Sequence, residues 1–325
     1  MNVTRRNFVA GTGLAGAVAI LAGCNSGSGS SSSSDGSGSY KIGVVQLTEH
    51  SALDATNEGF VEAINASGLN VTIDQQNAQN DQSACQTIAS KFVGDGVDLI
   101  YAIATPAAQA AAAATSDVPI VGSAITDYAA SGLVKDNDKP GTNVTGASDL
   151  TPVAEQLEMM QKVLPDVKKV GLLYCSAESN SDVQIATAKE ELDALGIAYD
   201  EYAVSSSNEI QSVVESAVGK VDALYAPTDN TIAAGAAQVG QICKENKLPF
   251  IPGEEGMCEA GGLFTLSINY TDLGKLAGEM AVKILKGESK PEDMAIEHLS
   301  TSELVVVKNE EMAEAIGVDL SVLDA

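Results

Sequence analysis

The sequence predicts an α/β protein made of two similar lobes, each a doubly wound parallel sheet. The first observation is a pair of matching apolar runs at residues 97–106 (VDLIYAIATP) and 221–230 (VDALYAPTDN). Each run ends in small and polar residues, which is typical of a buried strand that leads into a loop. A second match lies upstream, between residues 41–46 (KIGVVQ) and 169–174 (KVGLLY). The chain therefore contains an internal repeat.

The repeat sets the order of elements in each copy as strand, helix, strand, helix, apolar strand, helix and Pro-led strand. Gly68 and Gly196 follow the first helix of the two copies, and each stands 25 residues beyond a glycine of the first strand. Glycine at this place tolerates the left-handed conformation that ends a helix. Such alternation builds a parallel sheet, whose ligands bind beyond the carboxyl ends of the strands. Two lobes that face each other with these ends enclose a cleft.

In the first copy, Leu53 and Phe60 recur at helical spacing, whereas Val71 and Ile73 alternate as in a strand. Pro106 stands at the start of a helix, where its missing N–H is not needed. We expect strands at 40–46, 69–75, 97–104, 117–122 and 143–146, and helices at 52–66, 81–93 and 107–115.

In the second copy, Pro152 begins a helix, and Asp229 or Asn230 can cap another. Gly287 ends the helix that precedes it. We expect strands at 169–174, 199–204, 221–226, 248–253, 262–269 and 297–307, and helices at 151–163, 182–195, 208–219, 228–246, 270–285 and 312–316.

The charge pattern excludes a nucleic-acid binder. The net charge is −26, and the only two arginines are Arg5 and Arg6. A protein that binds nucleic acid needs a basic surface to neutralise phosphates. Acidity of this kind is typical of a solvated, solubilising surface. With 325 residues and 45% apolar content, the chain is long enough for two domains with a substantial core.

No motif predicts catalysis, a cofactor or a metal. The two histidines are His50 and His298, and the chain has no G-x-S-x-G elbow, no G-x-G-x-x-G after the first strand and no P-loop lysine motif. Histidines, cysteines and carboxylates are scattered, whereas a metal site needs them clustered. Glu254 and Glu255 are adjacent, but neighbours on a loop point in different directions, which favours a solvated loop over an acid/base pair.

The amino terminus predicts export and a lipid anchor. Residues 1–23 place Arg5 and Arg6 before a short apolar run, which is typical of an export signal. The paired arginines resemble a twin-arginine signal, and the general secretory route stays open. Leu-Ala-Gly before Cys24 resembles a bacterial lipobox, in which Cys24 carries lipid and anchors the chain to the membrane. Residues 24–39 join this cysteine to a Ser/Gly tether.

Four cysteines follow Cys24. Cys243 and Cys258 bracket one strand, and outside the cytoplasm they could pair. A bridge across this 15-residue separation would contribute ~3 kcal/mol by loop entropy. Cys85 and Cys175 are expected in different lobes, as small buried side chains.

Short hydrogen-bonding side chains and carboxylates cluster where strands end, and we predict that they line the cleft. Helix capping is the alternative for any one of them. A ligand carboxylate would meet helix N-termini and Ser, Thr or Asn side chains, because no arginine follows Arg6. A ligand ammonium would meet a carboxylate among Asp127, Asp149, Asp229 and Glu254. The predicted ligand-binding residues are Thr48, Glu49, His50, Thr105, Pro106, Thr126, Asp127, Asp149, Glu178, Asn180, Ser181, Thr228, Asp229, Asn230 and Glu254.

Several motifs carry a family resemblance that spans residues 40–287. They are Ala52-Leu-Asp54, Ala104-Thr-Pro-Ala-Ala-Gln109, Thr126-Asp127, Asn143-Val-Thr-Gly146 with Ser148-Asp149, Ser176-Ala-Glu-Ser-Asn-Ser181, Pro227-Thr-Asp-Asn230 and Tyr270-Thr-Asp-Leu-Gly274. With them the chain resembles the substrate-binding lipoproteins of ABC importers with the type I periplasmic-binding-protein fold, in particular tryptophan- and phenylalanine-binding members. The family often has Pro after Thr126-Asp127, where this chain has Tyr128, so one wall of the pocket departs from the pattern.

The resemblance implies three hinge strands near residues 146–149, 265–268 and 295–297, and lobes that close on a ligand. It implies a first lobe of residues 40–147 plus about 269–294, and a second of 148–268 plus about 295–325. The ligand would be a small amino-acid-like solute, with an aromatic one as the family's example. The closed form would deliver it to an ABC permease outside the cytoplasm, with no catalytic step and no cofactor.

Two alternatives from other classes stay open. The first is a ligand-binding sensor subunit that hands its closed form to a membrane receptor. The second is a secreted enzyme that works in the interlobe cleft, which the scarcity of histidine and the lack of a nucleophile motif disfavour.

Overall fold

The computed structural model describes residues 39–324. The expected export signal, Cys24 and the tether up to residue 38 lie outside the described residues. Within residues 39–324, no helix has both the length and the apolar character needed to cross a membrane.

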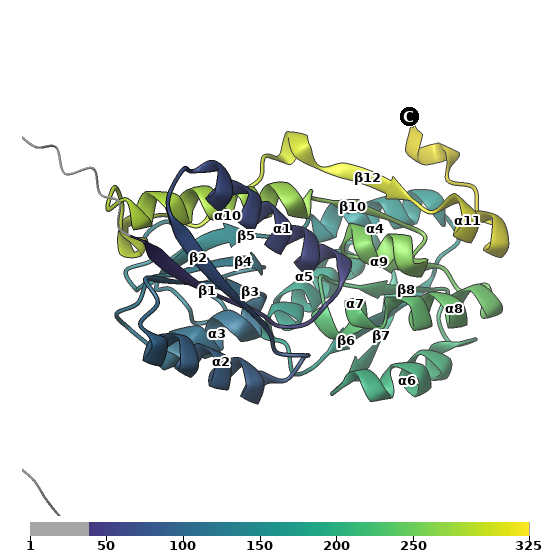
Figure 1. Cartoon of the computed structure of the whole chain (residues 1–325). Coiled ribbons are helices and arrows are strands. Elements are labelled where there is room, and N and C mark those ends of the chain that lie inside the picture. The colour runs from purple at the N-terminus through teal and green to yellow at the C-terminus, as the bar shows by residue number, and fades with distance from the viewer. Residues whose placement is uncertain (1–38, 325) are drawn as a thin grey trace, which may run out of the picture. The chain divides into compact units, whose positions relative to one another are not determined.

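The first lobe is a six-stranded parallel sheet with the strand order β11-β5-β4-β3-β1-β2. Helices α1 and α10 lie on one face of this sheet, and α2 and α3 lie on the other (Figure 1). The strands are β1 (Tyr40–Gln46), β2 (Val71–Asn77), β3 (Leu99–Ile103), β4 (Ile120–Ile125), β5 (Val144–Ser148) and β11 (Glu297–His298). The helices are α1 (Ser51–Ala66), α2 (Gln82–Asp95), α3 (Thr105–Ala114) and α10 (Tyr270–Leu285).

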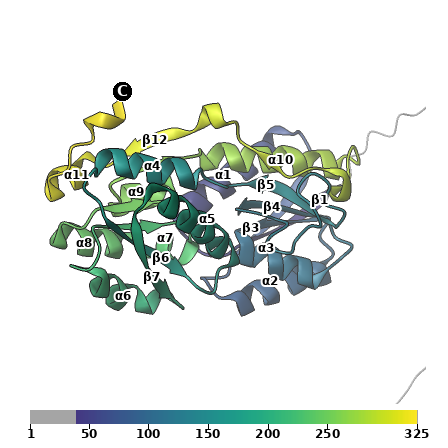
Figure 2. The ribbon, with the colours of Figure 1, turned by 180° about the vertical axis from the view of Figure 1, so that it is seen from behind.

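The second lobe has a parallel sheet of order β7-β6-β8-β9 and an antiparallel pair, β10-β12. Helices α4 and α5 pack together over one face of the parallel sheet, as Figure 2 shows from behind. The strands are β6 (Lys169–Cys175), β7 (Ala198–Val204), β8 (Ala223–Ala226), β9 (Phe250–Pro252), β10 (Phe264–Ser267) and β12 (Val305–Lys308). The helices are α4 (Val153–Val163), α5 (Ser179–Leu195), α6 (Ile210–Ala217), α7 (Asn230–Ala234), α8 (Ala236–Asn246), α9 (Glu255–Gly261) and α11 (Glu310–Ile316).

The internal repeat is present in the topology. The order β2-β1-β3-β4 in the first lobe has its equivalent in β7-β6-β8-β9 of the second. Each lobe has its own apolar core, one around β1, β3 and β4 and the other around β6 and β8. The cores alternate along the chain, so the chain passes between them near residues 148–152, 265–267 and 297–311. The predicted class, two doubly wound α/β lobes, is confirmed.

Helices α1 and α10 pack unusually closely, because small residues face each other. A Cβ atom at Gly59 would lie 1.9 Å from the carbonyl oxygen of Thr271, and one at Gly274 would lie 2.0 Å from that of Thr56. Only glycine fits at such a backbone contact. The packing holds the start of α10, which carries Tyr270, close to the start of α1.

Two expected elements are wrong. The single strand at 297–307 is two strands, because β11 joins β5 in the first lobe whereas β12 joins β10 in the second. A 3₁₀ turn at Thr301–Glu303, capped by Ser300, redirects the chain between them. The single helix at 228–246 is broken at Gly235, where a Cβ atom would lie 2.5 Å from the Cδ1 atom of Ile210.

The four described cysteines are free and buried. The bridge considered between Cys243 and Cys258 is not formed. Burial raises the pKa of both thiols to about 12. The Cys258 thiol faces the carbonyl oxygen of Val307 at 3.7 Å, so it packs against β12 instead.

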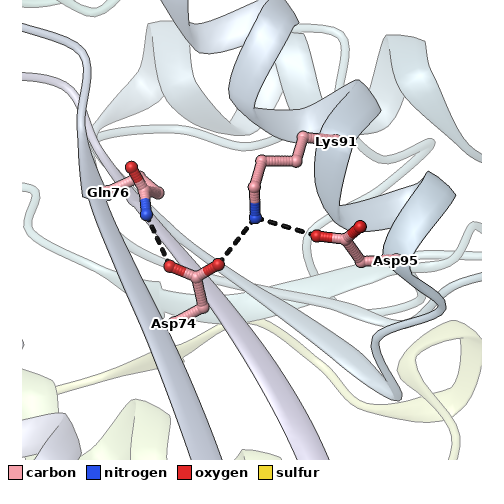
Figure 3. A network of polar contacts seen from close by, with 4 residues as sticks. All are labelled: Asp74, Gln76, Lys91 and Asp95. Atoms are coloured by element: carbon pink, nitrogen blue, oxygen red, sulfur yellow. Dashed lines mark hydrogen bonds and ion pairs between the residues drawn. The ribbon is translucent and has the colours of Figure 1, made fainter.

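An ion network lies on the outer side of the first lobe. The Nζ atom of Lys91 in α2 is 2.7 Å from Asp74 of β2 and 2.8 Å from Asp95 (Figure 3). Gln76 donates to the other oxygen of Asp74. Lys91 is 49% exposed, so solvent screens both pairs and each contributes little to stability. The network ties α2 to the edge strand.

Candidate functional site

Strand ends from both lobes enclose a small cavity. Its walls come from the starts of α1 and α10 and the end of β4 on one side, and from the ends of β8 and β9 on the other. The lining leaves room for about one water molecule. The lining residues are His50, Ala52, Leu53, Ala124, Asp149, Thr228, Asp229, Asn230, Ala233, Glu254 and Tyr270.

A second space of ≈ 150 Å³ shares three of these residues, Ala52, Glu254 and Tyr270. It opens between the starts of α1, α9 and α10. The two spaces therefore meet at the Glu254 and Tyr270 side chains.

The lobes are in direct contact around the cavity. Their hydrogen bonds join polar side chains of the strand-end loops and of helices α3 and α5, as expected for a closed cleft. These pairs are His50 Nε2 with Asn230 Oδ1 at 3.3 Å, Asn80 Nδ2 with Thr231 Oγ1 at 3.1 Å, Gln109 Nε2 with Ser179 Oγ at 3.3 Å, Thr126 Oγ1 with Thr228 Oγ1 at 3.4 Å, and Gln184 Nε2 with Thr126 Oγ1 at 3.2 Å.

Asp149 is a buried carboxylate at the point where the chain leaves the first lobe. Thr126 Oγ1 donates to one of its oxygens at 3.3 Å, and the Tyr270 hydroxyl donates to the other at 3.2 Å. Burial raises the pKa of Asp149 to about 6, although these hydrogen bonds oppose the shift. No lysine or arginine pairs with Asp149 among the salt bridges of residues 39–324, so its charge has no opposite partner.

Glu254 is the carboxylate that faces Asp149 from the second lobe. It caps α9 by accepting hydrogen bonds from the backbone N–H groups of Gly256 and Met257, both at 2.6 Å. Burial raises the pKa of Glu254 to about 7, and the charges of Glu255 and Asp149 add to the shift. Two acidic groups in one small space favour a cationic group of a ligand between them.

Two further predicted carboxylates, Asp229 and Glu178, stabilise the strand-end loops of the second lobe. Asp229 caps α7 through the Ile232 N–H at 2.8 Å and also accepts from the Cys175 N–H at 2.6 Å and the Ser181 hydroxyl at 2.7 Å. Burial and the charge of the neighbouring Glu178 raise the pKa of Asp229 well above its ordinary value.

Glu178 accepts hydrogen bonds from the backbone and side chains of Asn230 and Thr231. These hydrogen bonds fix the start of α7. Glu178 therefore contributes to the cleft by positioning Asn230 and Thr231. Asn180 and Ser181 are buried in the same network, where Asn180 Nδ2 donates to the Thr228 carbonyl at 3.0 Å.

The structure keeps some predicted residues out of the cavity wall. Asp127 accepts from the N–H groups of Ala129 and Ala130 and from Asn137 Nδ2. Burial acts to raise the pKa of Asp127, but these hydrogen bonds outweigh it and the pKa is lowered. Glu49 is exposed on the loop after β1.

Thr48, Thr105 and Pro106 are buried beside the cleft without lining the cavity. Thr105 begins α3, a helix without a side-chain N-cap, and its Oγ1 atom has no hydrogen-bond partner. An uncapped helix start with a free hydroxyl suits a ligand carboxylate.

Sequence reasoning missed several parts of the site. Tyr270 lines the cavity and contacts Asp149, and only its place in the motif Tyr270-Thr-Asp-Leu-Gly274 pointed to it. Gln184 lies on the inner face of α5, where it contacts Thr126 and Thr228. Ala104 and Ala124 have φ values of 84° and 54°, and nothing about alanine in a sequence indicates a positive φ. Such strained backbone at the ends of β3 and β4 is typical of ligand sites.

The comparison with protein families identifies the chain. Residues 41–323 match the family of ABC transporter substrate binding proteins. The chain belongs to this family. The family works outside the cytoplasm and binds small solutes for ABC transporters, so the resemblance in the sequence motifs is confirmed.

Relatives of this ABC substrate-binding protein include amino-acid binders. A tyrosine-binding protein of Clostridioides difficile is 40% identical over 92% of this chain and 88% of its own length. A structure from Streptococcus pneumonia in complex with L-Trp is also 40% identical, covers 88% of this chain and 98% of that chain, and superposes with a TM-score of 0.85.

A third relative of this substrate-binding protein is a ligand-free structure. The ligand-free, open structure of a Clostridium difficile substrate binding protein with adhesive properties is 46% identical and covers 86% of this chain and 95% of that chain. Its TM-score is only 0.66, against 0.85 for the less similar L-Trp complex. The chain therefore superposes better on the L-Trp complex than on the open structure.

Proposed function

We propose that this substrate-binding protein captures an aromatic L-amino acid between its lobes and presents the closed form to an ABC permease. The observation that carries the proposal is the buried group of Asp149, Glu254 and Tyr270 between the lobes. Two named relatives, a tyrosine-binding protein and an L-Trp complex, support the ligand class. The role is binding, without a catalytic step.

The ligand ammonium is assigned to Asp149 and Glu254. Both carboxylates are buried and lack a cationic partner among the described residues. An ammonium between them would restore charge balance and supply three donors. Charge-assisted hydrogen bonds of this kind are about twice as strong as neutral ones.

The ligand carboxylate is assigned to the start of α3. Thr105 offers a buried hydroxyl without a partner, and the helix has no side-chain cap. The N-terminal end of a helix carries partial positive charge, which replaces the arginine that the folded part of the chain lacks.

Other predicted site residues have one of two roles in this proposal. His50, Thr126, Thr228 and Asn230 join the lobes, whereas Glu178 and Asp229 hold the loops that carry them.

We further propose that Cys24 carries the lipid that holds the protein at the outer face of the membrane. The lipobox-like sequence before Cys24 and the Ser/Gly tether after it support this assignment. Residues 1–23 would then be removed as the export signal.

A thermal-shift screen tests the ligand class. L-tyrosine, L-tryptophan and L-phenylalanine are compared with L-leucine, L-lysine and the D-enantiomers. A ligand at 100 times its Kd stabilises the folded state by ~2.7 kcal/mol, which raises the melting temperature. We expect this rise for at least one aromatic L-amino acid, its loss in Asp149→Asn, and its retention in Lys91→Met at the distant ion network. A rise only with non-aromatic solutes would contradict the proposal.

A further inference from the structure

Gly256 of α9 meets Ser51 of α1 across the cleft. A Cβ atom built on Gly256 would lie 1.8 Å from the Oγ atom of Ser51 and 3.0 Å from its Cβ atom. Ser51 belongs to the first lobe, and Gly256 lies in the first turn of α9 in the second. A side chain at residue 256 therefore fits only if the Ser51 hydroxyl rotates away and the two lobes move apart by a few tenths of an ångström.

The lobe that contains Gly256 would accept a side chain at this position. Its φ lies outside the left-handed region, so alanine can adopt the same helical backbone. Within its own lobe the nearest atom to the added Cβ would be Glu254 Oε2 at 3.2 Å, a tight contact that the flexible Glu254 side chain relieves by a shift of a few tenths of an ångström. Gly253 is different, because a Cβ atom there would lie 2.6 Å from the Pro227 carbonyl carbon of the same lobe.

The contact lies beside the cavity. Ser51 and Gly256 both line the ≈ 150 Å³ space that shares Ala52, Glu254 and Tyr270 with the interlobe cavity. The approach of α9 to α1 at this point therefore determines how far Glu254 advances toward the first lobe.

We propose that Gly256 is a positioning residue that sets the limit of lobe closure, because its missing side chain lets α9 reach Ser51. This inference rests on the proposed function in one respect, namely that closure serves ligand binding. A side chain at residue 256 holds the lobes apart, and removal of the Ser51 side chain makes room for it.

A cross-linking series tests the proposal without any ligand. Asn80→Cys and Thr231→Cys are introduced into the full-length chain, because their native side chains meet across the cleft at 3.1 Å. The rate of cross-linking by a short bismaleimide then reports lobe closure. We expect Gly256→Ala to slow cross-linking by about tenfold, equivalent to ~1.4 kcal/mol, and Ser51→Gly to restore the rate in the double variant. Gly94→Ala, with nothing within 4 Å of its added Cβ, is the matched control.

An unchanged rate in Gly256→Ala, or a slow rate that Ser51→Gly does not restore, would overturn the inference. The melting temperature of ligand-free Gly256→Ala should equal or exceed that of wild type, which separates a closure defect from a folding defect. If the wild-type protein binds no aromatic amino acid, the proposed ligand class is wrong. The cross-linking rates still test the role of Gly256 in that case.

Discussion

At the residue scale, Asp149 carries most of the chemistry of the site. Its carboxylate is buried, accepts hydrogen bonds from Thr126 and Tyr270, and has a pKa raised to about 6 by burial. In the unfolded chain the same group has its ordinary pKa of 3.8. Ionised Asp149 therefore destabilises the folded state at neutral pH, and a ligand ammonium would offset this destabilisation.

The sign of the pH dependence follows from that shift. Between pH 3.8 and about 6 the folded state binds more protons at Asp149 than the unfolded state, so stability falls as pH rises. Asp149→Asn should raise the free energy of unfolding of the ligand-free protein at pH 8 by up to ~3 kcal/mol and change it little at pH 4. Urea unfolding at the two pH values measures this. Equal effects of the substitution at pH 4 and pH 8 would contradict it.

The other acidic residues show which features of a single residue the sequence can predict and which it cannot. Residue type and position after a strand predict Asp127, Asp149 and Asp229 at the cleft, and the structure places Asp149 and Asp229 in the cavity wall but keeps Asp127 out of it. The direction of each side chain depends on tertiary neighbours, so Asp229 caps α7 and Asp127 closes its own loop. Tyr270 was outside the predicted set because an aromatic residue at a helix start also suits a core position.

At the element scale, the close packing of α1 on α10 positions the first-lobe side of the site. Gly59 and Gly274 bring the two backbones into contact, and the start of α10 then presents Tyr270 to Asp149. A substitution between α1 and α10 therefore shifts the cavity wall even though the substituted residue does not line the cavity.

Substitution of Gly59 tests this packing. Gly59→Ala places a Cβ atom 1.9 Å from the Thr271 carbonyl oxygen, and overpacking of this kind costs ~1–3 kcal/mol. Gly94→Ala in α2 is the matched control, because its Cβ meets nothing within 4 Å and alanine favours a helix. Chemical denaturation should show a loss for Gly59→Ala and none for Gly94→Ala. Similar stabilities of the two variants would refute the packing argument.

The elements themselves were largely predictable from the sequence. The helix Tyr270–Leu285 and the strand Tyr40–Gln46 have the expected bounds, because strong periodicity and end signals agree there. The break at Gly235 and the split of 297–307 were not predictable. The split depends on pairing with two different sheets, whose strands are distant in the sequence.

At the scale of the whole molecule, the internal repeat gives two lobes whose strand ends face one cleft. The sequence repeat and its motifs were sufficient to predict this fold class and the family. The individual pairs that join the lobes were not predictable, because they join residues from separate copies, such as Thr126 with Thr228 and Ser51 with Gly256. The higher TM-score to the L-Trp complex than to the open relative agrees with contact between the lobes.

The most direct measurement is a calorimetric titration of the protein with L-tyrosine, L-tryptophan and L-phenylalanine at pH 8. We predict saturable one-to-one binding of at least one of them, weakened by about tenfold or more in Asp149→Asn, since hydrogen bonds to charged groups contribute ~1.5–3 kcal/mol. Binding should also weaken in wild type as the pH falls through about 6, because Asp149 becomes protonated. The absence of binding for all three ligands, or binding unchanged in Asp149→Asn, would contradict the account.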